Sequence, residues 1–407
     1  MGNTCYMNAV LQVLAHNPLL QHEYFVARHH NTTICDQARR QEALASSESS
    51  SDPAALAVAP VCLGCETSTL LHLLFPSPLS THQLTSPVVP QAMLEALWTH
   101  DASFATAQQQ DAHELLGALL SGIHKHTHQA VARGVLMSPL ARASSTVAGA
   151  SLVAQSPKFT ASGQSLCECV VHRNFAGVLH SKVTCAFCKN VSGTHDPFLD
   201  LSLPVERSDE DEDESGDEDG DADGAKGLSL RSLLRQFTAE ERLKGVNQVY
   251  CRRCSRYVDA TKRLELERLP NLLVLHLKRL DFHNQRKIGD VVTFPTRALD
   301  LREFCSELAA PSDALYDLAS VVNHHGDSVD GGHFTAFVHS GDVWLRLDDV
   351  NVTETTEQEV QQSQAYVQLL SLSKRLSLFM LVVACVVTMQ WSLCRYMLVY
   401  IRRRLFS

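Results

Sequence analysis

The segment Gly2-Asn3-Thr4-Cys5-Tyr6-Met7-Asn8-Ala9-Val10-Leu11-Gln12 begins with turn-forming residues and continues as a helical pattern. Apolar side chains recur at the spacing of one helix face, at Met7, Val10, Leu11 and Leu14. The pattern predicts that Cys5 lies in the first turn of a helix. The unpaired N–H groups and positive dipole end of such a turn favour the thiolate, which is the reactive form of a cysteine.

Two segments far downstream offer partners for such a nucleophile. They read Gly331-Gly332-His333-Phe334-Thr335-Ala336-Phe337 and Trp344-Leu345-Arg346-Leu347-Asp348-Asp349. Two strands joined by a tight turn at 340–342 would hold an imidazole against a carboxylate, either Asp348 or its neighbour Asp349. A lone cysteine at a helix start is more often a small buried residue. The distant histidine and aspartates favour the nucleophile instead.

These segments resemble the Cys box and the His box of the ubiquitin-specific proteases, which are papain-like cysteine peptidases. Ala9 stands where the family usually has Ser, and Phe334 where it usually has Tyr. The resemblance spans residues 2–370 and includes Gln108–Leu116 and the apolar strand Leu269–Leu280. It implies an α+β, papain-like fold with a helical thumb, a β-rich palm and zinc-tipped fingers. The implied site residues are catalytic Cys5, His333 and Asp348, with Asp349, Gln110 and Asp111 in support.

The implied activity is thiol-dependent hydrolysis of isopeptide bonds at the C-terminal glycine of ubiquitin, on membrane-associated or cytosolic substrates. One departure from the family pattern affects this implied activity. The family carries an asparagine five residues before its cysteine, which helps to bind the oxyanion. Here that position would precede Met1, the strand before it is missing too, and Asn3 has the wrong spacing. The alternative is therefore a membrane-tethered ubiquitin-binding module with an incomplete oxyanion hole. A cysteine peptidase acting on other proteins is a third reading.

Two Cys-x-x-Cys pairs predict a metal site. Four thiolates suit tetrahedral zinc at a closed structural site. The resemblance places the pairs at the tips of the fingers, so we expect structural Zn²⁺ there and no catalytic cofactor. The predicted ligands are Cys185, Cys188, Cys251 and Cys254. A third pair, Cys62 and Cys65, has no second pair nearby and is expected to be buried or free thiols, while Cys167 and Cys169 stay unassigned.

Composition narrows the class of protein. The formal net charge of −10 is misleading, because eleven acidic residues lie between Asp209 and Asp223, and without them acids and bases nearly balance. This gives no support for nucleic-acid binding. The odd number of 13 cysteines and the Cys-x-x-Cys pairs favour a reducing, cytosol-facing domain. Aperiodic or charged inserts are predicted at about 28–60, 137–164 and 208–224 of a catalytic domain spanning 1–370.

The C-terminal part predicts a membrane anchor. After a short linker at 371–375, Leu376 to Cys394 is 19 residues without a charge. At ~1.5 Å per residue it spans ~28 Å, close to the hydrocarbon core of a bilayer. Lys374 and Arg375 precede it, and a basic tail at 402–407 follows. We expect a transmembrane helix at 376–401 that anchors the chain in the mitochondrial outer membrane or the endoplasmic reticulum, with the catalytic domain in the cytosol. A buried C-terminal helix is the alternative.

Overall fold

The computed structural model describes residues 3–25, 35, 62–75, 88–106, 108–132, 167, 169–206, 228–281, 284–306, 314–329 and 331–373. The chain divides into two compact units. Unit 1 comprises residues 1–13, 108–113 and 155–373, and unit 2 comprises residues 14–107, 114–154 and 374–407. The three predicted inserts fall almost entirely outside the described residues, and the predicted transmembrane segment falls wholly outside them.

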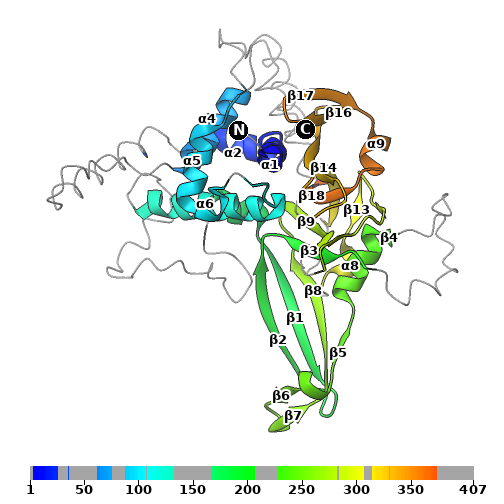
Figure 1. Ribbon diagram of the computed structural model, residues 1–407. Helices are drawn as coiled ribbons and strands as arrows, with labels where there is room; N and C mark the ends of the chain where they lie inside the picture. The colour runs from blue at the N-terminus through cyan, green and yellow to red at the C-terminus, as the bar shows by residue number, and fades with distance from the viewer. Residues whose placement is uncertain are drawn as a thin grey trace, which may run out of the picture. The chain divides into compact units, whose positions relative to one another are not determined.

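Unit 2 is helical in its described part. Helices α1 (Cys5–Ala15) and α6 (Ala112–Ala132) begin in unit 1 and end in unit 2, which also contains α2 (Pro18–Phe25), α4 (Leu63–Leu74), α5 (Gln91–His100) and η1 (Ala102–Phe104). Figure 1 shows α4, α5 and α6 as neighbours. A Cβ added at Gly122 of α6 would lie 2.2 Å from Leu63 Cδ1 of α4. This position therefore requires glycine for the two helices to approach closely.

Unit 1 contains all the strands of the described chain. Its elements are α7 (Val170–Phe175), β1 (Gly177–Cys185), β2 (Val191–Phe198), β3 (Leu201–Pro204), β4 (Leu228–Ser229), α8 (Leu230–Thr238), β5 (Glu241–Leu243), η4 (Gly245–Asn247), β6 (Val249–Cys251), β7 (Arg256–Val258), β8 (Ala260–Arg268), β9 (Leu272–Lys278), β10 (Leu280–Asp281), β11 (Arg286–Lys287), β12 (Val292–Thr293), β13 (Leu299–Asp300), η5 (Arg302–Phe304), β14 (Leu315–His325), β15 (His333–Ser340), β16 (Val343–Asp348), β17 (Asn351–Thr355), α9 (Glu357–Gln361) and β18 (Ala365–Leu372). Helices and strands together confirm the predicted α+β class.

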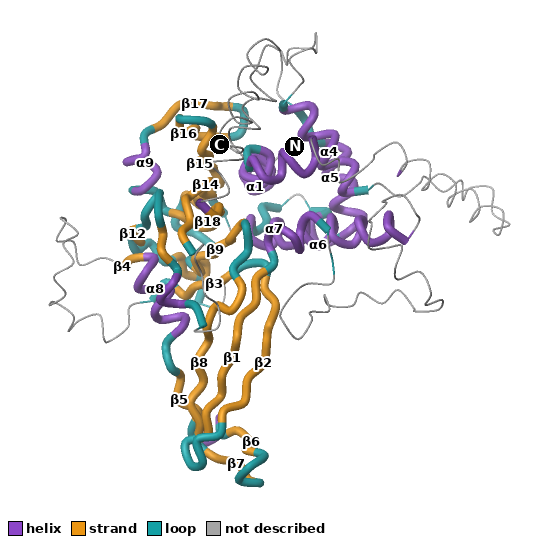
Figure 2. The backbone as a smooth tube through the Cα atoms, turned by 180° about the vertical axis from the view of Figure 1, so that it is seen from behind, coloured by secondary structure: helices purple, strands orange, loops and turns teal. Residues whose placement is uncertain are grey.

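The palm sheet is the eight-stranded sheet of unit 1. Its strands follow the order β17-β16-β15-β14-β18-β9-β3, and β13 pairs with β14 (Figure 2). All pairs on this path are antiparallel except β3 with β9. Strand β9 is buried almost throughout, with Leu272, Val274 and Leu277 fully inaccessible. Strand β9 confirms the apolar strand that the sequence predicts within Leu269–Leu280, and its burial is that of a strand covered on both faces.

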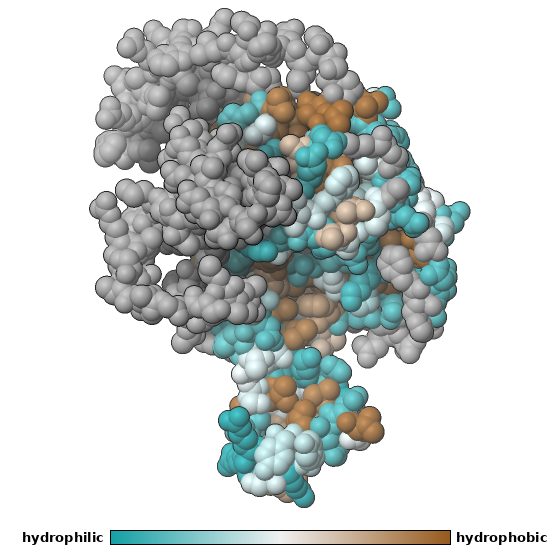
Figure 3. Space-filling model, turned by 60° about the vertical axis from the view of Figure 1, so that its left-hand side comes forward, coloured by the Kyte–Doolittle hydropathy of each residue, from teal (hydrophilic) through white to brown (hydrophobic). Residues whose placement is uncertain are grey.

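The fingers are the second sheet, in the order β2-β1-β8-β5, with the β6–β7 hairpin at the far end (Figure 1). Residues 178–184 of β1 pair with both β2 and β8, so the sheet is long and narrow. The tip carries exposed aromatic side chains. Phe187 is 71% exposed and Tyr257 69%, and Figure 3 shows apolar and hydrophilic surface interleaved on this lower lobe. The fingertip thus offers apolar surface to solvent, a common property of protein-binding surfaces.

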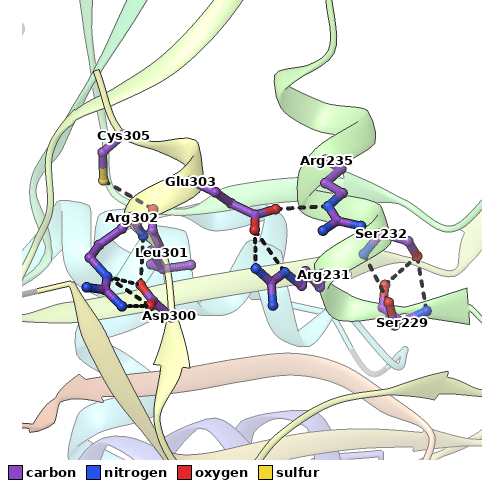
Figure 4. Close-up of polar contacts among 9 residues, drawn as sticks. All are labelled: Ser229, Arg231, Ser232, Arg235, Asp300, Leu301, Arg302, Glu303 and Cys305. Atoms are coloured by element: carbon purple, nitrogen blue, oxygen red, sulfur yellow. Dashed lines mark hydrogen bonds and ion pairs between the residues drawn. The ribbon is translucent and has the colours of Figure 1, made fainter. Parts of the chain in front are cut away.

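Helix α8 is tied to the palm by a small polar network (Figure 4). Ser229 and Ser232 form a capping box, each side-chain oxygen accepting the other residue's backbone N–H. Arg231 and Arg235, one helical turn apart, both donate to Glu303 of η5, with Nε–Oε distances of 2.9 Å. These contacts fix the start of α8 against η5, while its apolar face joins the palm core.

The end of the described chain corrects one predicted boundary. Strand β18 continues to Leu372, which pairs with Tyr316 of β14, and Ser371 pairs with Leu272 of β9. The first residues of the predicted linker at 371–375 therefore belong to a strand, because they form the last pairs of β18 with its neighbours β14 and β9. Within the described residues, the helices are too short or too polar to cross a membrane.

Candidate active site

Helix α1 presents Cys5 as its first residue, as predicted. The preceding Asn3 has a positive φ of 61°, and the N–H of Asn8 donates to the carbonyl of Thr4 at 2.9 Å to close the first turn. The Cys5 side chain is buried, with 7% exposure. Asn3 and Thr4 therefore place the sulfur at a helix N-terminus, close to the backbone N–H of Phe334 in the histidine box.

The β15–β16 hairpin brings His333 and Asp348 together. His333 is the first residue of β15 and Asp348 the last of β16, and the tight turn contains Gly341 at φ 62°. The Nε2 atom of His333 lies 2.7 Å from Asp348 Oδ1. This hydrogen bond lowers the pKa of Asp348, so the carboxylate stays ionised beside the imidazole. Because Nε2 is engaged, Nδ1 is the ring nitrogen left to exchange a proton with a substrate or nucleophile.

Asp349 has a different partner from Asp348. Its Oδ1 accepts a 2.7 Å hydrogen bond from Nδ2 of Asn8, which lies one turn after Cys5 on α1. Asp349 has a positive φ of 52°, so the backbone leaves the extended conformation directly after the end of β16. The two adjacent carboxylates therefore have separate contacts, Asp348 with the imidazole and Asp349 with the nucleophile helix.

Burial opposes ionisation of Cys5. It raises the pKa of the thiol above its ordinary value, and Asp349 adds to the rise, although the backbone N–H of Phe334 acts in the opposite direction. Desolvation therefore acts against the helix-terminal N–H groups that the sequence predicted to favour the thiolate. A neighbouring base that takes the proton of Cys5, or holds the thiolate as an ion pair, would offset this effect of burial.

Gln109 contacts both halves of the site. Its Nε2 lies 3.9 Å from Cys5 Sγ, and its Oε1 accepts a 3.0 Å hydrogen bond from the backbone N–H of Gly332. Gly332 has no room for a side chain, since an added Cβ would lie 2.4 Å from the carbonyl oxygen of His325. Gln109 thus presents an amide donor beside the sulfur and holds the residue before His333.

Two of the predicted supporting residues, Gln110 and Asp111, lie in the same extended segment as Gln109. Asp111 accepts hydrogen bonds from the Tyr366 hydroxyl and, at 2.6 Å, from the backbone N–H of His113. Gln110 is half-buried between Gln109 and Asp111. His113 lies 3.0 Å from Asp200 Oδ2. These contacts anchor the segment to the palm, and Gln109 places its amide nitrogen beside the sulfur.

The four predicted zinc ligands meet at the fingertip. Their sulfur atoms lie within 4.8 Å of one another, with Cys185 to Cys254 at 3.9 Å and Cys188 to Cys251 at 3.6 Å. Tetrahedral zinc with Zn–S bonds of ~2.3 Å requires sulfur separations of about 3.8 Å. The N–H of Cys188 donates to Cys185 Sγ at 3.4 Å and lowers the pKa of that thiol to about 6. The donor set and its spacing both fit a zinc ion.

Comparison with known proteins identifies the family. The profile of the family described as ubiquitin carboxyl-terminal hydrolase matches residues 1–369. The chain belongs to this family. Similar relatives include ubiquitin carboxyl-terminal hydrolase 51 of Mus musculus, 30% identical over 382 residues, and hydrolase 22 of Homo sapiens, 30% identical over 389. Each alignment covers 90% of this chain but only 49% and 63% of the relative. The chain thus spans about half to two-thirds of these relatives' length.

Solved structures of the same family share its fold. The chain is similar to a chain of the SAGA Ubp8/Sgf11/Sus1/Sgf73 DUB module bound to ubiquitin aldehyde, with a TM-score of 0.61 and 27% identity. A second structure of that module, bound to monoubiquitin, gives a TM-score of 0.62. These matches cover 91% of this chain and 68% and 67% of the other. They support the papain-like fold of thumb, palm and fingers that the sequence predicted.

Sequence analysis missed three features of this chain, one of which is the meeting of Cys167 and Cys169 with His124 and His172. It did not assign Gln109, although the residue stands immediately before the predicted Gln110 and Asp111. It also treated Cys62 and Cys65 as an isolated pair, whereas Cys35 joins them. The sequence around Cys35 is rich in Ser, Ala and His without a regular period, so it does not indicate that Cys35 contacts the pair.

Proposed function

We propose that this chain is a thiol-dependent deubiquitinase that cleaves isopeptide bonds at the C-terminal glycine of ubiquitin. The observation that carries the proposal is the His333–Asp348 hydrogen bond beside a helix-terminal cysteine, in a chain of the carboxyl hydrolase family. Structural relatives bound to ubiquitin aldehyde and monoubiquitin support ubiquitin as the partner. Turnover of a fluorogenic ubiquitin C-terminal amide tests it. Ubiquitin binding without turnover would favour the ubiquitin-binding alternative.

Each residue of the site has a separate role in the reaction. His333 removes the Cys5 proton through Nδ1, while Asp348 holds Nε2 and stabilises the imidazolium. The sulfur attacks the glycine carbonyl carbon, the C–N isopeptide bond breaks, and the imidazolium gives its proton to the departing lysine amine. Water, deprotonated by His333, then hydrolyses the thioester and frees Cys5. The Gln109 amide supports the oxyanion from its place beside the sulfur.

The raised pKa of Cys5 predicts a particular pH dependence of alkylation. If no base holds the thiolate, the thiolate fraction is small at neutral pH and grows as the pH rises. Iodoacetamide should therefore modify Cys5 of the free protein slowly at pH 7 and increasingly fast up to pH 10. A rate already at its plateau by pH 6 would instead reveal a preformed thiolate–imidazolium pair. Mass spectrometry of the Cys5 peptide distinguishes it from other thiols.

We also propose one structural Zn²⁺ at Cys185, Cys188, Cys251 and Cys254. The ion would join the end of β1 to the β6–β7 hairpin, where few apolar contacts hold the fingertip. Cys251→Ser should remove one equivalent of zinc relative to wild type and lower the melting temperature. Cys305→Ser is the matched control, because Cys305 is half-buried and donates to the Leu301 carbonyl away from the fingertip. Unchanged zinc content in Cys251→Ser would contradict the proposal.

The segment at 376–401 is proposed as a membrane anchor of the mitochondrial outer membrane or the endoplasmic reticulum, which leaves residues 1–373 in the cytosol. The support is sequence alone: 19 uncharged residues between basic flanks.

Truncation after Ser373, which spares all of β18, should release the protein from membranes and leave ubiquitin-amide turnover within about twofold. Alkaline carbonate washing measures the anchorage. Val383→Arg with Val386→Arg, which should weaken insertion, is the matched full-length variant. A full-length chain that washes off membranes would exclude the anchor.

A further inference from the structure

His113, near the start of α6, contacts the palm through its ring. It follows Gln109 in the same segment, and the Gln109 amide lies beside the Cys5 sulfur. The Nε2 atom of His113 lies 3.0 Å from Oδ2 of Asp200, the residue before β3. Its ring stacks on that of His276 of β9, with centroids 3.9 Å apart and an interplanar angle of 14°. One side chain therefore joins the start of α6 to the β3–β9 part of the palm, and all of these residues belong to unit 1.

The hydroxyl of Ser202 orients both partners of His113. Its Oγ donates to Asp200 Oδ2 at 3.3 Å and lies 3.0 Å from Nδ1 of His276. Burial lowers the pKa of His276 to about 3, so this ring is neutral, and its Nδ1–H donates to the hydroxyl oxygen. Burial opposes ionisation of Asp200, but the hydrogen bond from His113 outweighs it and lowers the pKa of the carboxyl. Because the ionised carboxylate only accepts, His113 donates through Nε2.

The backbone of the same segment is held from β18. The N–H of His113 donates to Asp111 Oδ1 at 2.6 Å, and the other oxygen of Asp111 accepts from the hydroxyl of Tyr366. The ring of Tyr366 in turn packs edge-on against His276, with centroids 5.0 Å apart. The ring and the N–H of His113 thus belong to one closed set of contacts with the palm. These contacts fix the segment immediately before α6 relative to strands β9 and β18.

The place of the Gln109 amide depends on this anchoring. Gln109 is half-buried, and its amide lies 3.9 Å from Cys5 Sγ and accepts a 3.0 Å hydrogen bond from the N–H of Gly332. A glutamine side chain has several rotatable bonds, so it keeps a productive position only while its backbone is held in place. A misplacement of about 1 Å at a catalytic group can cost about 10²-fold in rate. The anchor of the segment is therefore expected to affect the rate of reaction.

We propose that His113 is a positioning residue, which holds the Gln109 amide beside the sulfur of Cys5. Because His113 would take part in the same reaction, this assignment rests on the proposed function. His113 acts through Gln109, so its loss should weaken stabilisation of the oxyanion in the transition state and leave binding of ubiquitin nearly unchanged. A residue that only stabilised the fold would lower the melting temperature without a selective effect on kcat.

Steady-state hydrolysis of ubiquitin amide by the full chain is the first test. His113→Ala should lower kcat by about one to two orders of magnitude and leave KM within about twofold. His113→Gln should recover most of kcat, because the glutamine Nε2 can donate to Asp200 in place of the imidazole. His195→Ala is the matched control and should keep the wild-type kcat. His195 likewise contacts a carboxylate, that of Glu267, and stacks on a histidine, His180, but it lies on β2 of the fingers.

A double variant tests whether His113 acts through Gln109. Gln109→Ala alone should lower kcat at least as much as His113→Ala. The double variant should then be as active as Gln109→Ala within about twofold, because the amide that His113 positions is already absent. Asp200→Ala removes the contact from the palm side and should lower kcat as His113→Ala does. The Asp200 side chain is 37% exposed, so this variant should fold even if His113→Ala does not.

Three results would overturn the assignment of His113. They are a wild-type kcat in His113→Ala and Asp200→Ala, a His113→Gln variant as slow as His113→Ala, and losses that multiply in the double variant with Gln109→Ala. Each of them requires an active wild type, so none is confused with failure of the proposed function. A wild-type chain that does not hydrolyse ubiquitin amide would contradict the proposed function, and the role of His113 with it.

Discussion

Replacing Cys5 with alanine should abolish covalent capture of a ubiquitin probe that carries a C-terminal electrophile, and should reduce turnover by about five orders of magnitude or more. The reason is that Cys5 supplies the only sulfur beside the Gln109 amide and the β15 strand among the described residues. Without it no thioester forms, and the remaining groups can only position substrate. Gel-shift labelling and hydrolysis of ubiquitin amide measure the two effects.

The control for this experiment separates loss of chemistry from loss of fold. Cys5 is buried at the start of α1, and alanine is a good helix former, so the variant should fold and still bind ubiquitin. Cys305→Ala, which removes a thiol away from the site, should be labelled like wild type. Equal labelling of Cys5→Ala and wild type would show that another thiol is the nucleophile. Absent labelling of wild type, with intact ubiquitin binding, would favour the non-catalytic alternative.

The sequence predicts a structural feature well when the residues that determine the feature lie close together in the chain. The helix at Cys5 and the β15–β16 hairpin follow from periodicity and a glycine turn within a few residues, and the structure has both. The four fingertip cysteines occur as two Cys-x-x-Cys pairs, and this pattern alone predicts that the two pairs meet at one metal site. These features need little information about the rest of the fold.

The other features of the site depend on contacts between residues that are distant in sequence, which no local pattern predicts. Gln109 meets Cys5 and Gly332 across long stretches of chain, and the polar segment around Gln109 gives no reason to favour it over Gln110. The effect of burial on the pKa of Cys5 could not be predicted for the same reason. The helix start is visible in the sequence, whereas the burial that outweighs it is a property of the packed structure. The choice between Asp348 and Asp349 likewise depends on the direction in which β16 ends.

The second large effect is expected from replacing His333 or its partner Asp348. His333→Ala should lower kcat/KM about as much as loss of the nucleophile, because it removes the base that takes the proton of Cys5. Asp348→Asn should cost about four orders of magnitude, since an amide hydrogen-bonds Nε2 in the wrong tautomer and cannot stabilise the imidazolium.

Asp349→Asn is the matched control for Asp348→Asn, with the same chemical change at the next residue. Asp349 contacts Asn8 rather than the imidazole, so this variant should keep kcat/KM within about tenfold. Removing its charge also removes one of the influences that raise the pKa of Cys5, so the onset of alkylation should move to lower pH. A larger loss in Asp349→Asn than in Asp348→Asn would reverse the assignment and make Asp349 the partner of His333 during turnover.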